Sequence, residues 1–396
     1  MSPNTGQIWP AVQSIEVKWT RDEYPAGSRR QALKHRGPYS AALVSPIAGQ
    51  VLSLRPELQT AVEDAAIELA RFDAEVGRMV APFASMLMRS EAASSSQIEN
   101  LTSSPSSVLK AEFGLGETPN ATLIVSNQLA MKAAIDASED LSVDSLLQMH
   151  RTLMFQADPE NAGRLRDQAV WIGGSNLGPH GADYIAPEAS AVPDLMSDLI
   201  AFSRRLDLPA IAQVALAHAQ FETIHPFTDG NGRTGRALVQ AMLHRLGVTA
   251  NVTVPVSAGL LQDTARYFEA LNSYRLGLIE PIISVFADAA RDAIANGRQL
   301  ASDLHTAEAR WRERLTVRSD SGAAKLVARL MEQPVISSAS AVEILGTTPA
   351  NAQLAIDKLV ELGILRQLGS GARNRLWQAA DVIFALDDFA ERIKRK

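Results

Sequence analysis

The chain of 396 residues contains no cysteine. Disulfide bonds, thiolate metal sites and cysteine nucleophiles are therefore excluded, and the composition fits a cytoplasmic protein, which is the location we expect. No apolar run approaches the roughly 18 residues that a spanning helix needs, so we expect no membrane partner. The N-terminus, MSPNTGQIWP, is polar and lacks the apolar stretch of a signal peptide, so we expect none.

An excess of positive charge is also missing. The net charge is −6 at pH 7, with 46% apolar and 21% charged residues. This balance argues against a protein that coats nucleic acid through its overall charge, and it is ordinary for a globular protein with a large core. The length predicts two or three domains.

Helical periodicity dominates the middle of the chain, and strand signals are few. Apolar residues three to four apart mark one face of a helix: Val62, Ala66, Leu69 and Phe72. Two short extended runs, 169–172 and 183–185, flank a turn rich in glycine and proline and predict a β-hairpin. The first 60 or so residues are rich in proline, glycine and arginine, and we expect loose order there.

The pattern changes after about residue 323. Two predicted helices, 340–346 and 348–362, precede two extended runs, 364–368 and 374–377. This succession resembles a winged helix-turn-helix domain. From residue 331 onward eight acidic residues balance eight basic ones, whereas DNA-binding domains are usually basic. We therefore favour protein interaction or dimerisation over DNA binding for this domain, and both stay open.

A glycine-rich turn, Asp229-Gly230-Asn231-Gly232, opens onto a predicted helix, 233–246. The preceding helix, 209–224, ends at His225 because Pro226 disfavours the α conformation of the residue before it. Backbone N–H groups and the positive end of the helix dipole favour a phosphate at such a helix start.

The side chains around this turn suit phosphate chemistry. Arg233 and Arg236 lie three residues apart on one helical face, where both guanidinium groups can bind phosphate oxygens. Asp229 is a hard oxygen ligand of the kind that Mg²⁺ prefers. His225 titrates near neutral pH and can accept a hydroxyl proton. The sequence has no Walker A motif, so we exclude a P-loop protein.

A zinc hydrolase is the rival enzyme class. His218 and His225 are seven residues apart and could share a helix face. A zinc site needs a third ligand and usually an HExxH motif, and the sequence has no such motif. We therefore interpret His218 as a packed or capping residue.

Residues 225–236, HPFTDGNGRTGR, resemble the Fic family motif, His-Pro-Phe-x-(Asp/Glu)-Gly-Asn-Gly-Arg-x-x-Arg, and match it at every fixed position. The resemblance implies a helical bundle in which the motif lies between two central helices. It implies transfer of AMP from ATP to a Ser, Thr or Tyr hydroxyl of a protein, with release of pyrophosphate. DeAMPylation or another phosphate transfer stays open. The implied partners are ATP, target proteins and the chain itself through auto-AMPylation, and a homodimer is also open.

The same resemblance assigns roles to individual residues. His225 would deprotonate the target hydroxyl, and Asp229 would hold Mg²⁺ on the α- and β-phosphates. Arg233 and Arg236 would hold the β- and γ-phosphates, and Phe227 would lie in the core. The residues that would stabilise the α-phosphate are Gly230, Asn231 and Gly232.

A second motif precedes the first. Residues 95–100, SSQIEN, resemble the family's inhibitory helix motif, (Ser/Thr)-x-x-x-Glu-(Gly/Asn). Ser95 and Glu99 are four residues apart and share a helical face. By the resemblance, Glu99 would pair with Arg236, occupy the γ-phosphate position and restrain transfer. The alternative is that this serine-rich segment only ends a helix.

The predicted hairpin resembles the family's flap, which aligns a target segment by strand pairing. Trp171 and Ile172 are the candidate target contacts, and an ordinary hairpin is the alternative. Tyr267 and Asn272 lie where the family often contacts adenine, and the alternative is that they belong to the core.

The expected fold class is mainly α: a Fic-type helical bundle with a small β-hairpin flap and a C-terminal winged helix-turn-helix domain. We expect four segments along the chain. They are an N-terminal Fic-associated segment (1–75), a Fic domain with an inhibitory helix near 85–100 (76–295), a connecting helix (296–322) and a winged-helix domain (323–396).

Overall fold

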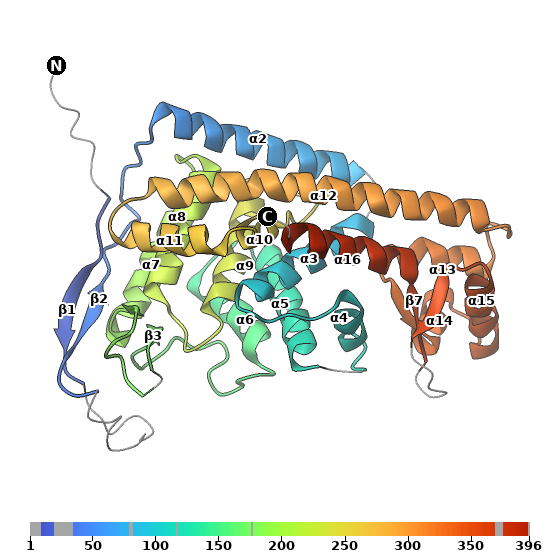
Figure 1. Cartoon of the computed structure of the whole chain (residues 1–396), viewed down its shortest axis with the longest axis horizontal. Coiled ribbons are helices and arrows are strands. Elements are labelled where there is room, and N and C mark those ends of the chain that lie inside the picture. The colour runs from blue at the N-terminus through green and yellow to red at the C-terminus, as the bar shows by residue number, and fades with distance from the viewer. Residues whose placement is uncertain are drawn as a thin grey trace. The chain divides into compact units, whose positions relative to one another are not determined.

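The computed structural model describes residues 9–19, 35–78, 82–115, 118–175, 177–368 and 375–394. Helices dominate it, as the apolar periodicity predicts (Figure 1). The chain divides into two compact units, of which the first comprises residues 1–66, 129–248 and 264–288 and the second residues 67–128, 249–263 and 289–396. No helix in the described ranges is both long and apolar enough to cross a membrane.

The first unit contains the glycine-rich turn. Its helices are α6 (Val143–Met154), η2 (Ala189–Ala191), α7 (Val192–Ser203), α8 (Ala210–Ile224), α9 (Asn231–Arg245) and α11 (Thr264–Arg275). Its strands are β1 (Gln13–Val17), β2 (Tyr39–Leu43), β3 (Trp171–Ile172) and β4 (Tyr184–Ile185). Three further helices have residues in both units: α2 (Pro56–Arg78), α5 (Pro119–Asp136) and α12 (Glu280–Arg314).

Helix α8 forms the centre of the first unit. Its residues from Ile211 to Ile224 are all buried, which suits a helix that is apolar or closely packed on every side. It packs against α7, α9 and α11. A Cβ on Gly235 of α9 would lie only 3.0 Å from the Phe221 ring. Glycine at this position therefore lets α9 approach α8.

Two strands lie where we expected loose order. β1 pairs antiparallel with β2, and Gln13 lies opposite Leu43. The expectation was wrong for these strands because their hydrogen bonds join segments that are distant in sequence. A local composition rich in proline and glycine does not reveal such pairing.

The second unit contains α3 (Pro82–Ile98), α4 (Pro105–Ala111), α10 (Val256–Leu261) and a C-terminal module. The module consists of α13 (Gly322–Leu330), β5 (Val335–Ser337), α14 (Ser338–Leu345), α15 (Pro349–Glu361), β6 (Leu365–Leu368), β7 (Leu376–Ala379) and α16 (Ala380–Lys394). Strand β7 lies between β5 and β6 and is antiparallel to both. This order agrees with the resemblance to a winged helix-turn-helix domain, which stays a prediction.

Local signals explain where the module's helices begin and end. Helix α14 stops at Gly346, which has a φ of 58° that glycine adopts without strain. Helix α15 begins after Thr348, whose side chain accepts the N–H of Asn351. The two helices were predicted, whereas β5 and α16 were not.

Helix α3 is fastened within the second unit by buried polar contacts. The Glu91 carboxylate accepts the backbone N–H and the hydroxyl of Ser257 at 2.8 and 2.6 Å. Because Ser257 lies in the first turn of α10, the negative charge is also favoured by that helix's dipole. Asn127 of α5 donates to the Ala92 carbonyl and the Ser96 hydroxyl at 3.0 and 3.1 Å. These contacts fix the position of α3 relative to α5 and α10.

The expected segment boundaries differ from the helices of the structure. Helix α12 runs without a break from Glu280 to Arg314, so the expected boundary at 295/296 falls inside it. The expected connecting helix ends at Arg314 rather than at residue 322. A buried apolar stripe continues along this helix through Ile294, Leu300, Leu304 and Trp311, which is why the helix is not interrupted.

Candidate active site

The turn from His225 to Gly230 connects α8 to α9. The His225 N–H donates to the Phe221 carbonyl at 2.9 Å and ends α8, with a φ of 50° and a ψ of 62°. The predicted helix end at His225 is therefore confirmed. A non-glycine residue in this left-handed region is strained, and such strain persists only where the surrounding structure enforces it.

Asn231 closes the turn through its side chain. Its Oδ1 accepts the N–H of Phe227, and its Nδ2 donates to the Phe227 carbonyl, both at 2.9 Å. The resemblance assigned Asn231 to the α-phosphate. Here both polar atoms of the side chain bind the turn's own backbone, so the side chain shapes the turn.

Gly230 begins α9 in a conformation that a side chain would disfavour. Its φ is 73°, and an added Cβ would lie 2.8 Å from the Met154 Sδ. Its N–H donates to the Asp229 Oδ1 at 2.6 Å. Both the backbone angle and the neighbouring α6 therefore require glycine here.

Arg166, which the sequence placed only in the segment resembling the flap and to which it gave no role in the turn, binds the other end of the turn. Its Nε donates to the His225 carbonyl at 2.8 Å, and its Nη2 donates to the Ile224 and Pro187 carbonyls at 3.3 and 2.7 Å. Its own backbone N–H donates to the Pro226 carbonyl at 3.0 Å. Arg166 is buried, and a planar guanidinium can serve several carbonyls that an ammonium group would not reach together.

His150 of α6 supports the middle of the turn and was also missed. Its Nδ1 accepts the Gly163 N–H at 3.0 Å, so its Nε2 carries the proton and donates to the Asp229 carbonyl at 3.0 Å. Its ring stacks on Phe227 with centroids 3.7 Å apart. Burial lowers the pKa of His150 to about 4, so the ring is neutral at pH 7 and keeps this pattern of donor and acceptor.

The predicted residues of the turn differ in exposure. Asp229 is exposed and His225 is partly buried, while Phe227 is fully buried as expected. Arg233 and Arg236 are buried, at 3% and 2% exposure. The structure brings these residues together in one stretch of α9 and the turn before it. Asp229 is open to solvent and His225 is partly so, although the His225 Nδ1 is buried, and the two cations lie deeper.

A magnesium ion fits this chemistry through Asp229. No group of three or more His, Asp and Glu side chains within the described ranges is arranged to hold a metal. Mg²⁺ often binds one or two carboxylates together with substrate phosphates and water. One exposed carboxylate beside a helix start that favours phosphate therefore suits an ion shared with a nucleotide.

His218 is a packed residue, as interpreted from the sequence. It lies in α8, and its Nε2 is 2.7 Å from the hydroxyl of Tyr267 in α11. Burial, and then the positive charge of Arg236, lower the pKa of His218 to about 3. Tyr267 is 1% exposed, so the structure places it in the core, whereas Asn272 is exposed and accepts from Arg275 at 2.9 Å.

The predicted hairpin is present. β3 pairs antiparallel with β4, and Trp171 lies opposite Ile185. Ile172 is 39% exposed, and the Trp171 Nε1 donates to the Ser175 carbonyl at 2.8 Å. The exposed side chain of Ile172 is compatible with a target contact.

A tyrosine attaches this hairpin to α8. The Tyr184 hydroxyl donates to the Thr223 carbonyl at 2.6 Å, close to the end of the helix. Burial raises the pKa of Tyr184, so the hydroxyl stays protonated as this donor. The Arg275 guanidinium lies 3.7 Å from the centre of the tyrosine ring. The hairpin is therefore fixed beside the His225 turn.

Ser95 and Glu99 belong to the second unit. Ser95 is fully buried in α3, and Glu99 follows the helix in a turn. Asn100 has a φ of 62°, and the Leu101 N–H returns to the Ser96 carbonyl at 3.0 Å, which ends α3. The inhibitory pairing of Glu99 with Arg236 stays a prediction.

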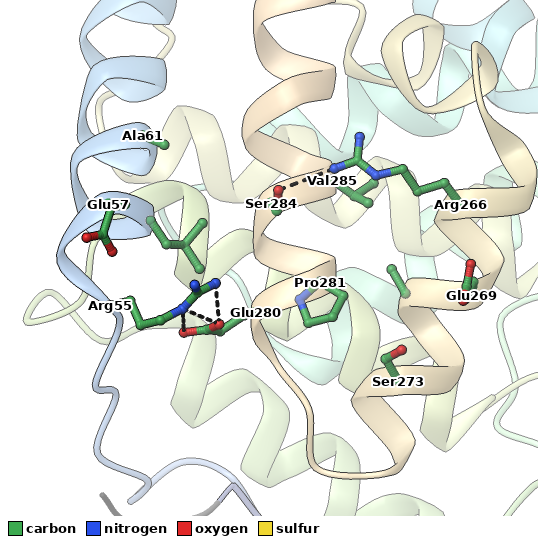
Figure 2. Close-up of a pocket in the computed structure, with 12 residues that line it drawn as sticks. Arg55, Glu57, Ala61, Arg266, Glu269, Ser273, Glu280, Pro281, Ser284 and Val285 are labelled. Carbon is green, nitrogen blue, oxygen red and sulfur yellow. Dashed lines mark hydrogen bonds and ion pairs between the residues drawn. The ribbon is translucent and has the colours of Figure 1, made fainter. Parts of the chain in front are cut away.

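A pocket of about 550 Å³ in the first unit contains none of the predicted site residues. Figure 2 shows it between the starts of α2 and α12 and the side of α11. Arg55 binds Glu280 at 2.7 Å, and Arg266 binds Asp288 at 2.7 Å. The guanidinium groups of this pocket are therefore already held by carboxylates.

In the described part of the C-terminal module, two basic side chains near the predicted DNA-facing elements are already in contact with other side chains. On α15, Lys358 pairs with Glu361 at 2.9 Å. Arg375 donates to Gln353 at 3.2 Å and lies 5.1 Å from the Trp377 ring. These contacts agree with the balanced charge of the sequence and give no specific support to DNA binding.

Two family profiles match parts of the chain. The profile of the Fic/DOC family matches residues 140–243, and that of the Fic/DOC family N-terminal region matches residues 59–136. Within these two regions the chain resembles the Fic/DOC family. The N-terminal match begins inside the expected segment 1–75 and ends at residue 136.

Individual relatives agree with this class. "Protein adenylyltransferase fic-1" of Caenorhabditis elegans is 32% identical over 149 residues, which cover 38% of this chain and 27% of the relative. "Protein adenylyltransferase Fic" of Nematostella vectensis is 35% identical over 159 residues, which cover 39% of this chain and 33% of the relative. The matched region thus spans about a third or less of these curated relatives.

The fold has a counterpart among solved structures. A Fic family protein from Desulfovibrio desulfuricans G20 superposes with a TM-score of 0.51 at 20% identity. The superposition covers 83% of this chain and 97% of that protein. At 20% sequence identity this superposition shows a similar fold alone.

We expect Arg166→Lys to loosen the His225 turn, because lysine cannot bind the several carbonyls that the guanidinium reaches. Hydrogen bonds to a charged group contribute about 1.5–3 kcal/mol each, so the free energy of unfolding should fall by about 2–4 kcal/mol. Hydrogen exchange of the amides in residues 225–230 should speed up at least tenfold. The control is Arg164→Lys, the same change at an exposed neighbour. If both variants lowered the free energy of unfolding and sped up amide exchange equally, Arg166 would not be the residue that holds the turn.

We expect His218 to make the protein less stable in acid. Its folded pKa of about 3 lies below the ordinary value of 6.5, so its stabilisation is complete above pH 6.5 and is lost as the pH falls toward 3. The groups that face it are Glu222 on α8, Arg236 on α9 and Tyr267 on α11. The free energy of unfolding should fall by up to about 1.4 kcal/mol per pH unit from this residue.

Urea unfolding of the full chain at pH 7, 6 and 5 measures this dependence. His218→Gln should make it shallower, and His305→Gln, at an exposed position, should leave it unchanged. An unchanged slope in His218→Gln would show that the buried histidine is not the cause.

Proposed function

We propose that the chain transfers AMP from ATP to a Ser, Thr or Tyr hydroxyl of a protein. The observation that carries the proposal is the turn from His225 to Gly230, held in a strained conformation at the start of α9. It presents a solvent-accessible imidazole and carboxylate beside a helix start, with two buried arginines behind them. The relatives named as protein adenylyltransferases support the same chemistry.

In the proposed reaction His225 accepts the proton of the target hydroxyl. The hydroxyl oxygen then forms a bond to the α-phosphorus of ATP, and the bond from that phosphorus to the oxygen bridging to the β-phosphate breaks. Pyrophosphate leaves with the electron pair of the broken bond. The strained backbone at His225 positions the imidazole in advance, which lowers the cost of reaching the reactive geometry.

Phosphate stabilisation comes from backbone and cations. The backbone N–H groups at Gly230 and Gly232 belong to the start of α9, where the dipole favours the negative charge of the α-phosphate. Asn231 contributes by fixing the turn through Phe227. Arg233 and Arg236 would hold the β- and γ-phosphates with guanidinium groups. Mg²⁺, held by Asp229, would neutralise phosphate charge when bound.

The hairpin is the proposed docking site of the target. Trp171 and Ile172 lie on a strand that is fastened to α8 through Tyr184. An extended target segment would add to the exposed edge through backbone hydrogen bonds, with Ile172 in contact with an apolar target side chain. Because the main chain is common to all proteins, this mode accepts varied sequences. Asn272 is exposed and is the candidate for an adenine contact. Tyr267 is buried, so its proposed contribution is to pack the core beneath the site.

Mass spectrometry of the chain incubated with ATP and Mg²⁺ tests the donor group. We expect a mass increase of one AMP on the chain or on an added protein. His225→Ala should reduce the rate at least a hundredfold, in the range that loss of a general base produces, and His305→Ala should not. A phosphate-sized increase would replace AMP transfer with kinase chemistry.

We further expect Glu99→Gly to raise transfer at least tenfold, because the carboxylate that would occupy the γ-phosphate position is removed. Glu99→Gln should raise it as well, since it removes the charge and keeps the size. Asn100→Gly is the matched control, because glycine preserves the positive φ at the end of α3 and leaves Glu99 in place. Equal transfer rates in the wild type, Glu99→Gly, Glu99→Gln and Asn100→Gly would refute inhibition by Glu99. Removal of AMP from pre-labelled protein by the wild type, lost in Glu99→Gly, would assign the reverse reaction.

A further inference from the structure

A pocket of about 470 Å³ lies in the second unit, between α3, α4 and α16. This volume is within the range of roughly 300–1,000 Å³ that is typical of small-molecule sites. The N-terminal half of the chain supplies one wall and the C-terminal helix α16 supplies the other. Its lining differs from that of the pocket in Figure 2, where carboxylates already hold the guanidinium groups.

The floor of the pocket is apolar. Its buried side chains are Val108, Leu109, Ile124, Leu386, Phe389 and Ile393. Covering apolar surface of this kind with the body of a ligand is favourable, because that surface is removed from water.

Among the charged groups around the pocket, one carboxylate lacks a direct partner. Arg89 binds Glu112 at 2.8 Å, and Lys394 binds Glu391 at 3.0 Å. Asp387 makes no hydrogen bond or ion pair with any residue in the described ranges. Burial, and then the charges of Asp388 and Glu391, raise the pKa of Asp387, and the charge of Lys394 offsets only part of this rise.

A second polar group in the pocket also lacks a partner. Ser90 is 5% exposed, and its Oγ has no hydrogen-bond partner within the part of the chain that the structure describes. A buried hydroxyl without a partner costs free energy that a bound polar group can recover. Ser90 lies on α3 and Asp387 lies on α16. Both walls of the pocket therefore offer a polar group to a ligand.

We propose that this pocket binds a small molecule that has an apolar, ring-containing body and a primary ammonium group. The apolar body covers the floor formed by residues such as Val108 and Phe389. The ammonium group forms with Asp387 the direct ion pair that no described side chain makes.

The position of the pocket gives the site a regulatory consequence, which rests on the proposed function. Ser90, Ala93, Ser94 and Gln97 line it and form one face of α3. Ser95 lies about 140° around the helix from Ser90, since each residue turns the helix by about 100°. A ligand that joins this face to α16 therefore restrains α3 without touching the inhibitory face. Binding should hold Glu99 in place and deepen inhibition.

Titration calorimetry of the full chain with 4-phenylbutylamine tests the site. We expect saturable binding, with affinity at least tenfold weaker for the neutral 4-phenylbutanol and for the anionic 4-phenylbutyrate. Asp387→Asn should weaken amine binding at least tenfold. Asp388→Asn is the matched control, because it removes the same charge from the next residue of α16, which does not line the pocket. Ala390→Leu narrows the pocket and should weaken the binding of all three compounds.

Absence of binding at millimolar amine would overturn the proposal. An equal loss of amine affinity in Asp387→Asn and Asp388→Asn would overturn it as well. Equal affinity for the amine and the carboxylate would overturn the assigned charge. Hydrogen exchange of residues 90–97 reports on α3 independently of activity and should slow several-fold with amine. If the amine binds and slows exchange but no AMP transfer is detected in any variant, the site stands and the proposed function fails.

Discussion

The candidate site depends on the strained backbone between His225 and Gly230. Two residues of this turn have positive φ, and one of them is not glycine. Such a conformation is maintained only by contacts that outweigh its cost. Arg166 binds carbonyls at one end, His150 binds a carbonyl and a ring in the middle, and Asn231 closes the turn. Each of these side chains uses its polar atoms on the backbone, which fixes the turn before any ligand is present.

This arrangement separates positioning from chemistry. The residues that hold the turn are buried, and burial keeps His150 neutral and its hydrogen bonds directed. The groups that would meet a substrate, His225 and Asp229, are the more accessible ones. Preorganisation of this kind favours electrostatic stabilisation of a transferring phosphate, because the donors need little rearrangement when charge develops. The close packing of α9 on α8 at Gly235 serves the same end, since it positions the helix whose start is the proposed phosphate site.

Helix α3 has contacts of different kinds around its circumference. Glu91 ties it to α10, and Ser96 and the Ala92 carbonyl receive Asn127 of α5. The face with Ser90 borders the pocket shared with α16. Ser95, which belongs to the predicted inhibitory motif, lies on another face of the helix. Because α3 is one rigid helix, a ligand that restrains the face with Ser90 also restrains the face with Ser95. The helix itself does not need to change conformation. The C-terminal module would then act on transfer through α3, a role that does not need DNA.

The sequence by itself determined the motif residues, the end of α8 before Pro226, the hairpin and two helices of the C-terminal module, α14 and α15. These features depend on local rules: a proline restricts the residue before it, a glycine permits positive φ, and apolar residues recur at helical spacing. Tertiary structure alone decided the roles of Arg166 and His150, the pairing of β1 with β2 and the placement of Tyr267 in the core. Each of these depends on contacts between residues that are distant in the chain, such as Arg166 with the His225 carbonyl. An arginine's sequence neighbours do not reveal which carbonyls it will meet, because that is set by the packing of helices around it.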